Sequence, residues 1–216
     1  MVNVIAIDGP AGSGKSTIAK LIAEKKGYVY INTGAMYRAI GLYCDTHGIP
    51  CENEAITDDL FKNISIDFDL NGNILLNGED ISEKITSPKV AKLASDYSAL
   101  PNVRKHLTKL QRQIGLKKPS VLEGRDIGTV VFPDAKYKFF IDASPFERAK
   151  RRYLQLKEKN SDLQITVEEL LKQQMERDEQ DKNRKIAPLK KADDAIYIDT
   201  TGKSIDEVVE EIIKYL

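Results

Sequence analysis

The chain lacks any long apolar segment. Its 216 residues contain no run near the roughly 20 consecutive apolar residues that a membrane-spanning helix needs. The first five residues also lack the charged and apolar regions of a signal peptide, and they lead directly into an expected strand. We therefore expect a cytoplasmic protein with no membrane partner.

An excess of positive charge is also missing. The 33 Lys and Arg residues balance 33 Asp and Glu residues, so the formal net charge is zero. Domains that bind polymeric nucleic acid usually carry a strong basic excess. With 41% hydrophobic residues the composition indicates a soluble globular chain, and its length allows a sizeable core. We expect no polymeric nucleic acid as a partner.

Cysteine and histidine are scarce, with two of each. Cys44 and Cys51 flank His47, which brings three soft metal ligands close together in the sequence. A structural zinc site needs four ligands, however, and this spacing matches no common zinc pattern. We predict two ordinary cysteines in a reducing compartment, without a metal or a disulfide.

Arginine is rare as well, with 9 Arg against 24 Lys. Several of the arginines cluster in short segments, such as 148–152 and 177–184. A chain that uses Lys by default can reserve Arg for positions where a planar fork binds phosphate or carboxylate. Chance explains the distribution equally well, so both interpretations stay open at this point.

Hydrophobic periodicity predicts strands that alternate with helices. A short apolar run at 2–8 and a helical pattern at 13–26 are typical of a buried parallel strand and its crossover helix. Further strands are expected at 28–31, 120–123, 137–141 and 195–198, and further helices at 34–47, 88–100, 102–116, from Pro145 onward, 153–177 with a break at 160–164, and 204–216. We predict an α/β three-layer sandwich around a parallel sheet of about five strands.

One segment departs from this alternation. Residues 65–79 alternate apolar and polar side chains around Asn71-Gly72, which is a strong hairpin signal, and a second Asn-Gly pair stands at 77–78. Antiparallel hairpins are foreign to a parallel core. We therefore interpret residues of about 60–85 as an inserted antiparallel subdomain, and the charged helical stretch 153–177 as a mobile flap.

The segment GPAGSGKS at 9–16 matches the phosphate-binding pattern G-x-x-x-x-G-K-[ST] at every fixed position, between an expected strand and an expected helix. Glycines let the backbone wrap a triphosphate closely, and the helix N-terminus favours its negative charge. Lys15 reaches the β- and γ-phosphates, while the Ser16 hydroxyl binds Mg²⁺. The predicted ATP-binding residues of this P-loop are Gly9, Pro10, Ala11, Gly12, Ser13, Gly14, Lys15, Ser16 and Thr17.

An acidic partner for the magnesium ion is expected on a neighbouring strand. Asp142 ends an apolar run, Asp126 follows the run that ends near Glu123, and Asp8 ends the first strand. The sequence does not distinguish among Asp142, Asp126 and Asp8, and Asp142 could equally cap the helix that follows it.

Further blocks follow the P-loop in a fixed order: NTGAMYR at 32–38, EGRDIGTVVFP at 123–133, RD at 177–178, and then Asp181, Arg184, Ala187 and Pro188. This ordered set resembles the bacterial cytidylate kinase family along the whole chain, and the hairpin insert is similar to that family's enlarged monophosphate subdomain. The family often has Ser where this chain has Thr33, and both residues keep a hydroxyl.

The resemblance implies a role for each block. Arg38 and Arg125 would grip the α-phosphate of CMP, and with Lys15 they form the expected catalytic set. The other CMP-binding residues implied are Thr33 and Tyr37 near the phosphate, Ser95, Arg104 and Asp126 around the base, and Arg177, Asp181 and Arg184 around the sugar and base. Arg148, Arg151 and Arg152 would belong to a lid that closes over ATP and excludes water. For these three lid arginines, an ordinary solvated helix face is the alternative.

Residue chemistry supports the assignment of Asp126. Cytosine presents an exocyclic amine, from which a carboxylate can accept a hydrogen bond. Uracil presents a carbonyl at that position, which a carboxylate would repel. We expect no general base, because the acceptor phosphate is already anionic and needs only orientation.

We therefore predict that the chain transfers the γ-phosphoryl group of ATP to CMP, with dCMP as a second acceptor and Mg²⁺ as the cofactor. The expected parts are a P-loop core at 1–33, 86–152 and 178–216, a monophosphate-binding insert at 34–85 and a helical lid at 153–177. A monomer is expected. The alternatives are a kinase for UMP, AMP or a non-nucleotide acceptor, and a P-loop ATPase that acts as a switch.

Overall fold

The computed structural model describes residues 3–69, 72–159 and 164–216. A five-stranded sheet in the order β2-β6-β1-β7-β8 forms its centre, and all four strand pairs are parallel. The strands are β1 (Val4–Asp8), β2 (Val29–Asn32), β6 (Ser120–Gly124), β7 (Tyr137–Asp142) and β8 (Ile196–Asp199). The predicted α/β fold with a five-stranded parallel sheet is confirmed.

The strand order brings the functional loops to one edge of the sheet. At the carboxyl end of β1, Asp8 pairs in register with Gly124 of β6 and Phe140 of β7, and Asn32 of β2 pairs with Glu123. The P-loop after β1, the start of the helix after β2 and the 125–126 turn after β6 therefore leave the sheet side by side. In open α/β sheets ligands bind at this edge.

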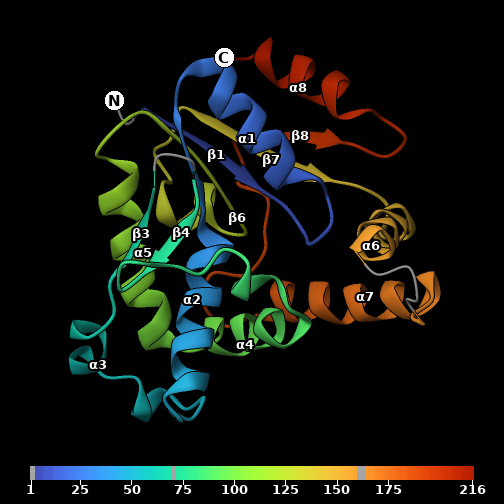
Figure 1. Cartoon of the computed structure of the whole chain (residues 1–216). Helices are drawn as coiled ribbons and strands as arrows, with labels where there is room; N and C mark the ends of the chain where they lie inside the picture. The colour runs from blue at the N-terminus through green and yellow to red at the C-terminus, as the bar shows by residue number, and fades with distance from the viewer. Residues whose placement is uncertain (1–2, 70–71, 160–163) are drawn as a thin grey trace.

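Helices cover both faces of the sheet. Helices α1 (Lys15–Lys26) and α8 (Ile205–Ile213) pack together on one face, where Ile18 and Ile212 join the apolar core (Figure 1). The π-helical turn η3 (Ile127–Val131) and helix α5 (Pro101–Gly115) lie on the opposite face.

Helix α1 begins two residues later than the helical pattern suggested. Gly14 precedes it with φ +87°, a left-handed conformation that stops the helix from extending backward into the P-loop. Helix α2 (Thr33–Thr46) begins directly after β2, because the Asn32 side chain accepts a hydrogen bond from the Ala35 amide and caps it.

The inserted segment forms a separate antiparallel sheet of β3 (Ile66–Phe68), β4 (Ile74–Leu76) and β5 (Glu79–Asp80). Asn77 and Gly78 join β4 to β5 with φ values of +51° and +84°, as a two-residue hairpin turn requires. The other predicted turn includes Leu70 and Asn71, which lie outside the described residues.

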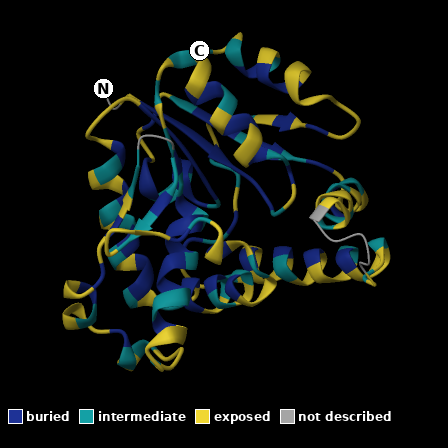
Figure 2. Ribbon diagram, in the orientation of Figure 1, coloured by how far each residue is buried: buried dark blue, intermediate teal, exposed yellow. Residues whose placement is uncertain are grey.

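A second apolar core lies away from the main sheet. It joins α2 with α3 (Asp58–Lys62), the small sheet, α4 (Pro88–Ser98), α5 and the short turn η2 (Lys84–Thr86). The short turn η1 (Asn53–Ala55) precedes α3. Ile40, Phe61 and Leu107 are buried in it, and Figure 2 shows dark blue segments through this region. The predicted limits of the insert, 34–85, stay a prediction, and this packing favours adding α4 and α5 to the same part of the molecule.

Helices α6 (Pro145–Lys159) and α7 (Val167–Asn183) form the predicted flap region and contact each other (Figure 1). Helix α7 begins with a capping box in which the side chains of Thr166 and Glu169 each bond the other residue's backbone amide. The predicted break at 160–164 falls mostly on 160–163, outside the described residues. In the part of the chain that the structure covers, no helix combines the length and the apolar character needed to cross a bilayer.

Candidate active site

The P-loop follows β1 and wraps back toward α1. Gly9 has φ +155°, and a Cβ atom at this position would lie 2.0 Å from the Ile141 carbonyl oxygen. Gly12 has φ +78°, and its Cβ would lie 3.0 Å from the amide nitrogen of Gln174. A side chain at Gly9 cannot fit without moving β7, and Gly12 and Gly14 hold backbone angles that other residues resist. The loop therefore presents backbone amides at the N-terminus of α1.

Lys15 lies inside this loop. Its ammonium donates a hydrogen bond to the Pro10 carbonyl at 3.0 Å, and only 6% of the residue is exposed. Burial, and then the nearby Arg125 charge, lower the pKa of Lys15 to about 7. An anion in the loop would raise this pKa again, so Lys15 is suited to bind a phosphate group.

Glu123 is the carboxylate that contacts Ser16. The Ser16 hydroxyl donates to Glu123 Oε1 at 2.6 Å, and the Tyr30 hydroxyl donates to the same oxygen at 3.1 Å. The Thr33 hydroxyl donates to the Glu123 carbonyl at 2.7 Å. Glu123 thus links the P-loop, β2 and the start of α2.

The three carboxylates considered from the sequence bind other groups. Asp8 accepts from the amides of Ile127 and Gly128 at 2.8 and 2.7 Å, and so holds the turn after β6 against the P-loop strand. Asp126 pairs with Arg104, and Asp142 accepts from the Ala143 amide. Sequence reasoning missed Glu123, because its place beside Ser16 depends on β6 lying next to β1.

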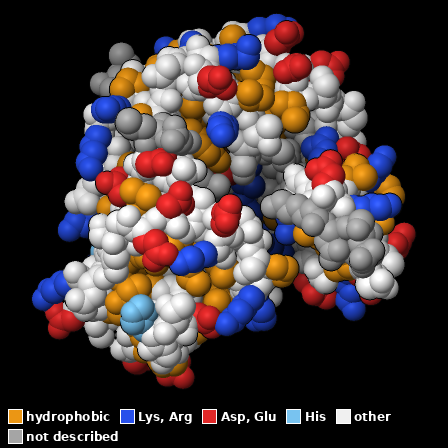
Figure 3. All heavy atoms as spheres, in the orientation of Figure 1, with side chains coloured by type: hydrophobic (Ala, Val, Ile, Leu, Met, Phe, Trp, Pro, Cys, Tyr) orange, Lys and Arg blue, Asp and Glu red, His pale blue; other side chains and the backbone are white. Residues whose placement is uncertain are grey.

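Positive side chains converge next to Lys15. Burial, and then the Arg125 charge, lower the pKa of Arg177 to about 10, and burial followed by charges that include Arg125 and Arg152 lowers the pKa of Arg38. Figure 3 shows blue side chains in the hollow between the main body and the α6–α7 pair. Cations at this density outnumber the carboxylates beside them and attract anions such as phosphates.

Asp181 of α7 is the acidic partner within this group. It accepts from Arg125 Nε at 2.9 Å and lies 3.5 Å from Arg184 Nη1. Burial opposes ionisation of Asp181, yet Arg125 and Arg184 outweigh it and hold its pKa below its usual value. Arg177 and Asp181 lie on α7, whereas Arg184 follows the last residue of this helix as its C-cap, and the three residues still lie close together.

The predicted base-binding residues form a buried cluster. Arg104 donates to Asp126 at 3.0 Å and to the Tyr37 hydroxyl at 3.4 Å, and Tyr37 lies beneath the Arg104 guanidinium. Ser95 of α4 donates to Gln180 of α7 at 3.5 Å, at the rim of this cluster.

Several buried donors in this region have no hydrogen-bond partner within the described chain. They are Nε of Arg104, Nε and Nη2 of Arg184, Nε of Arg177 and the amide nitrogen of Gln111. Buried polar groups are almost always paired, so these donors indicate a polar ligand rich in acceptors. Gln111 was not predicted from the sequence, where it is one polar residue on a charged helix.

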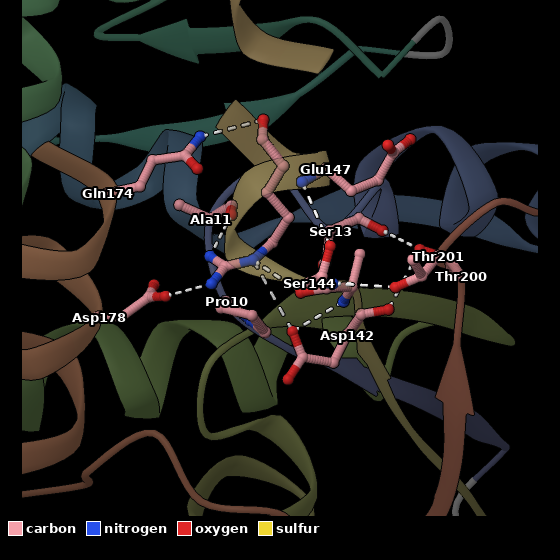
Figure 4. Close-up of polar contacts among 12 residues, drawn as sticks. Pro10, Ala11, Ser13, Asp142, Ser144, Glu147, Gln174, Asp178, Thr200 and Thr201 are labelled. Carbon is pink, nitrogen blue, oxygen red and sulfur yellow. Dashed lines mark hydrogen bonds and ion pairs between the residues drawn. The ribbon is translucent and has the colours of Figure 1, made fainter. Parts of the chain in front are cut away.

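The three predicted lid arginines differ in their surroundings. Arg148 donates to the Ala11 and Ala143 carbonyls and to Asp178 (Figure 4). Arg151 donates to Glu147 and twice to Thr200. Arg152 has no such partner among the described residues, and its charge acts on Arg38. Only Arg152 is therefore free, in this conformation, to bind a phosphate.

A cavity of about 240 Å³ lies between the start of α2 and the small sheet, and Arg38 lines it together with Tyr30, Asn73 and Thr86. The small sheet thus borders the surroundings of Arg38.

Comparison with known proteins gives one consistent family. Residues 5–216 match the family model described as Cytidylate kinase. A cytidylate kinase of Fervidobacterium nodosum is 52% identical over 209 residues, which cover 97% of this chain and 94% of that protein. A cytidylate kinase of Clostridioides difficile is 50% identical over 210 residues, with 97% and 96% covered.

One solved structure resembles the fold at low sequence identity. An uncharacterized protein from Eubacterium ventriosum aligns with a TM-score of 0.53 at 16% identity, over 100% of this chain and 98% of that one. This likeness concerns the fold alone.

Proposed function

This chain belongs to the cytidylate kinase family and phosphorylates CMP with ATP, and we propose that the P-loop holds ATP while the arginine cluster beside it holds CMP. The observation that carries this assignment is the convergence of Lys15, Arg38, Arg125 and Arg177 on one hollow. Two polyanionic substrates must meet there, and one cation cluster shared between them offsets their repulsion.

At the donor end, the P-loop amides and Lys15 bind the β- and γ-phosphates of ATP. Lys15 exchanges its bond to the Pro10 carbonyl for bonds to phosphate oxygens. Thr17 at the start of α1 and Arg152 of α6 are the other residues that we assign to the ATP site.

Binding of ATP at pH 8 is expected to take up about one proton, because Lys15 has a pKa of about 7 in the free protein and the triphosphate raises it. The uptake should fall toward zero near pH 6, where Lys15 is already charged. Titration calorimetry in two buffers of different ionisation enthalpy measures it. The Lys15→Met variant is the control, and an equal uptake at pH 8 in that variant would assign the proton to another group.

At the acceptor end, Arg38 and Arg125 hold the α-phosphate of CMP, with Thr33 and Tyr37 shaping the pocket. Arg177, Asp181 and Arg184 bind the ribose and the edge of the base, together with Ser95. A ribose that lacks its 2′-hydroxyl keeps all the phosphate and base contacts, so dCMP is the second acceptor that we propose.

Asp126 reads the base. Arg104 donates a hydrogen bond to the Asp126 carboxylate at 3.0 Å and orients it, and the carboxylate oxygens have further lone pairs that can accept from the cytosine amine. The uracil carbonyl would face the same negative charge and be repelled.

The chemical step needs orientation and charge neutralisation. An α-phosphate oxygen of CMP forms a bond to the γ-phosphorus of ATP, while the bond from that phosphorus to the β,γ-bridging oxygen breaks and ADP leaves. The attacking oxygen carries no proton, so no general base is required.

The residues present fit a magnesium ion. Magnesium prefers oxygen ligands, takes most of them from phosphate and water, and needs few from the protein. The Ser16 hydroxyl and the Glu123 carboxylate, 2.6 Å apart, supply oxygens at the donor site. No group of three or more His, Cys, Asp or Glu side chains suited to a metal was found among the described residues. When bound, Mg²⁺ would neutralise the β- and γ-phosphate charge.

The Glu123→Gln variant is expected to weaken Mg²⁺ binding about 10- to 100-fold, which is typical for loss of a side chain that orders a metal's ligands. Binding of Mn²⁺ to the complex with ADP, followed by electron paramagnetic resonance, measures this without turnover. Asp142→Asn is the matched control, since Asp142 also ends a strand of the sheet but does not contact Ser16. Equal metal affinity in Glu123→Gln and wild type would rule out this role of Glu123.

Stimulation by the acceptor separates a kinase from a nucleotide-hydrolysing switch. We expect ADP formation from ATP and Mg²⁺ to depend on added CMP. ADP formed at the same rate without CMP would favour the switch. The monomeric state and the cytoplasmic location stay predictions.

A further inference from the structure

Arg148 joins three parts of the molecule through one buried guanidinium. The residue is 3% exposed and lies in the first turn of α6. Its Nη1 donates to the Ala11 carbonyl of the P-loop at 2.9 Å, and its Nε donates to the Ala143 carbonyl after β7 at 3.0 Å. Its Nη2 donates to Asp178 of α7 at 2.6 Å (Figure 4). These bonds use three of the five N–H donors of Arg148, so its main contacts in this conformation are to the protein itself.

Asp178 belongs to the motif at 177–178, in which a role was expected for Arg177 alone. It is 6% exposed, and it lies next to Arg177 and one helical turn before Asp181. Its carboxylate faces the P-loop side through Arg148, whereas Asp181 bonds Arg125 on the acceptor side. Helix α7 is therefore attached to the donor loop by one carboxylate and to the acceptor cluster by the other.

Two buried charges are costly to desolvate, and replacing such a pair with apolar residues is often neutral or stabilising. A buried pair is thus weak evidence for stability alone. Here the pair sets the distance between α7 and the P-loop. Asp178 belongs to α7, and its partner Arg148 is bonded to the Ala11 carbonyl of the P-loop.

We propose that Asp178 is a positioning residue that holds α7 in register with the P-loop, so that Arg177, Asp181 and Arg184 meet CMP at the correct distance from ATP. This inference rests on the proposed function. It makes Asp178 a determinant of CMP binding through the helix that it holds, beside the direct effect of its charge on the neighbouring Arg177.

Asp178 and Arg148 hold different partners, so their variants should change the KM for CMP and the KM for ATP to different extents. In Asp178→Asn, Arg148 keeps its bonds to the two carbonyls, so the P-loop stays in place, while its bond to α7 loses the carboxylate charge and holds the helix less tightly. We expect the KM for CMP to rise at least fivefold while the KM for ATP changes by less than twofold. In Arg148→Lys the loop and the helix both lose a partner, so both KM values should rise.

The test measures both KM values for Asp178→Asn, Arg148→Lys and the double variant. Once Arg148 is gone, Asp178→Asn should raise the KM for CMP by less than a further twofold, because the two residues act through one contact. Glu179→Gln, an exposed carboxylate on the same helix, is the matched control and should leave both KM values unchanged. Asp178→Glu keeps the charge but changes its reach, and it should also raise the KM for CMP.

The inference is overturned if Asp178→Asn and Asp178→Glu bind CMP as wild type does, or if their two KM values rise by the same factor. If circular dichroism shows that Asp178→Asn does not fold, the same comparison of the KM for CMP with the KM for ATP is made with Asp178→Glu. Turnover of CMP by the wild-type protein tests the proposed function separately. The ratio of the KM for CMP to the KM for ATP, compared between variant and wild type, tests only the role of Asp178 in positioning α7.

Discussion

Replacement of Lys15 by methionine is expected to lower kcat with CMP by about 10²- to 10³-fold, the usual cost of removing one preorganised charge from a transition state. Lys15 is buried in the P-loop and its only described hydrogen bond is to the Pro10 carbonyl, a partner that phosphate can replace. The charge that develops on the β,γ-bridging oxygen then lacks its nearest cation.

Steady-state ADP formation at saturating ATP and CMP measures this effect. Lys20→Met is the matched control, since Lys20 is an exposed lysine on the same helix and should leave kcat unchanged. Thermal unfolding of Lys15→Met should show a fold at least as stable as wild type, because the variant no longer buries an ammonium group. A Lys15→Met protein that keeps more than a tenth of the wild-type kcat would contradict the donor-site assignment.

The second large effect is expected from Asp126→Asn. A hydrogen bond to a charged group contributes roughly 1.5–3 kcal/mol, so kcat/KM for CMP should fall about 10- to 100-fold. The amide can offer a donor to the uracil carbonyl, so kcat/KM for UMP should stay constant or rise. The ratio of CMP to UMP activity would therefore fall more than the CMP activity itself.

Asparagine is preferred to alanine at this position because its side-chain oxygen can still accept a hydrogen bond from the buried Arg104, whereas alanine would remove this partner altogether. The matched control is the Asp134→Asn variant, because Asp134 is an exposed carboxylate that follows η3 in the chain. If Asp126→Asn lowers the activity with CMP and with UMP by the same factor, Asp126 supports the pocket without reading the base.

Features encoded by neighbouring residues could be predicted from the sequence. The P-loop is one, because its glycine angles and its helix N-terminus depend on nine consecutive residues. The five strands are another, since each is an apolar run bounded by loop residues. The turn at Asn77 and Gly78 follows from the tolerance of these two residues for positive φ.

Features that depend on strand order or on distant partners could not be predicted. Glu123 reaches Ser16 across 107 positions of the sequence, and Asp8 reaches Gly128 across 120. Arg148 resembled a solvated lid residue because nothing local shows that the Ala11 carbonyl lies within its reach. Arg112, outside all the motifs, donates to the Val130 and Val131 carbonyls and closes the turn after Asp126.

The scarcity of arginine can now be interpreted. Of the nine arginines, Arg112 holds the backbone of η3, and Arg148 and Arg151 bind backbone oxygens around the P-loop. Most of the others converge on the acceptor cluster described above. Several arginines thus serve the structure of the loops, and the use of the others for phosphate stays a prediction.

The most direct test of the central claim is ADP formation from ATP and Mg²⁺ with CMP, dCMP, UMP or AMP supplied one at a time. We predict strong turnover with CMP and dCMP and little with UMP or AMP, because Asp126 accepts from the cytosine amine and repels the uracil carbonyl. Equal turnover of UMP would contradict the base-reading role of Asp126, and no stimulation by any monophosphate would contradict the acceptor site as a whole.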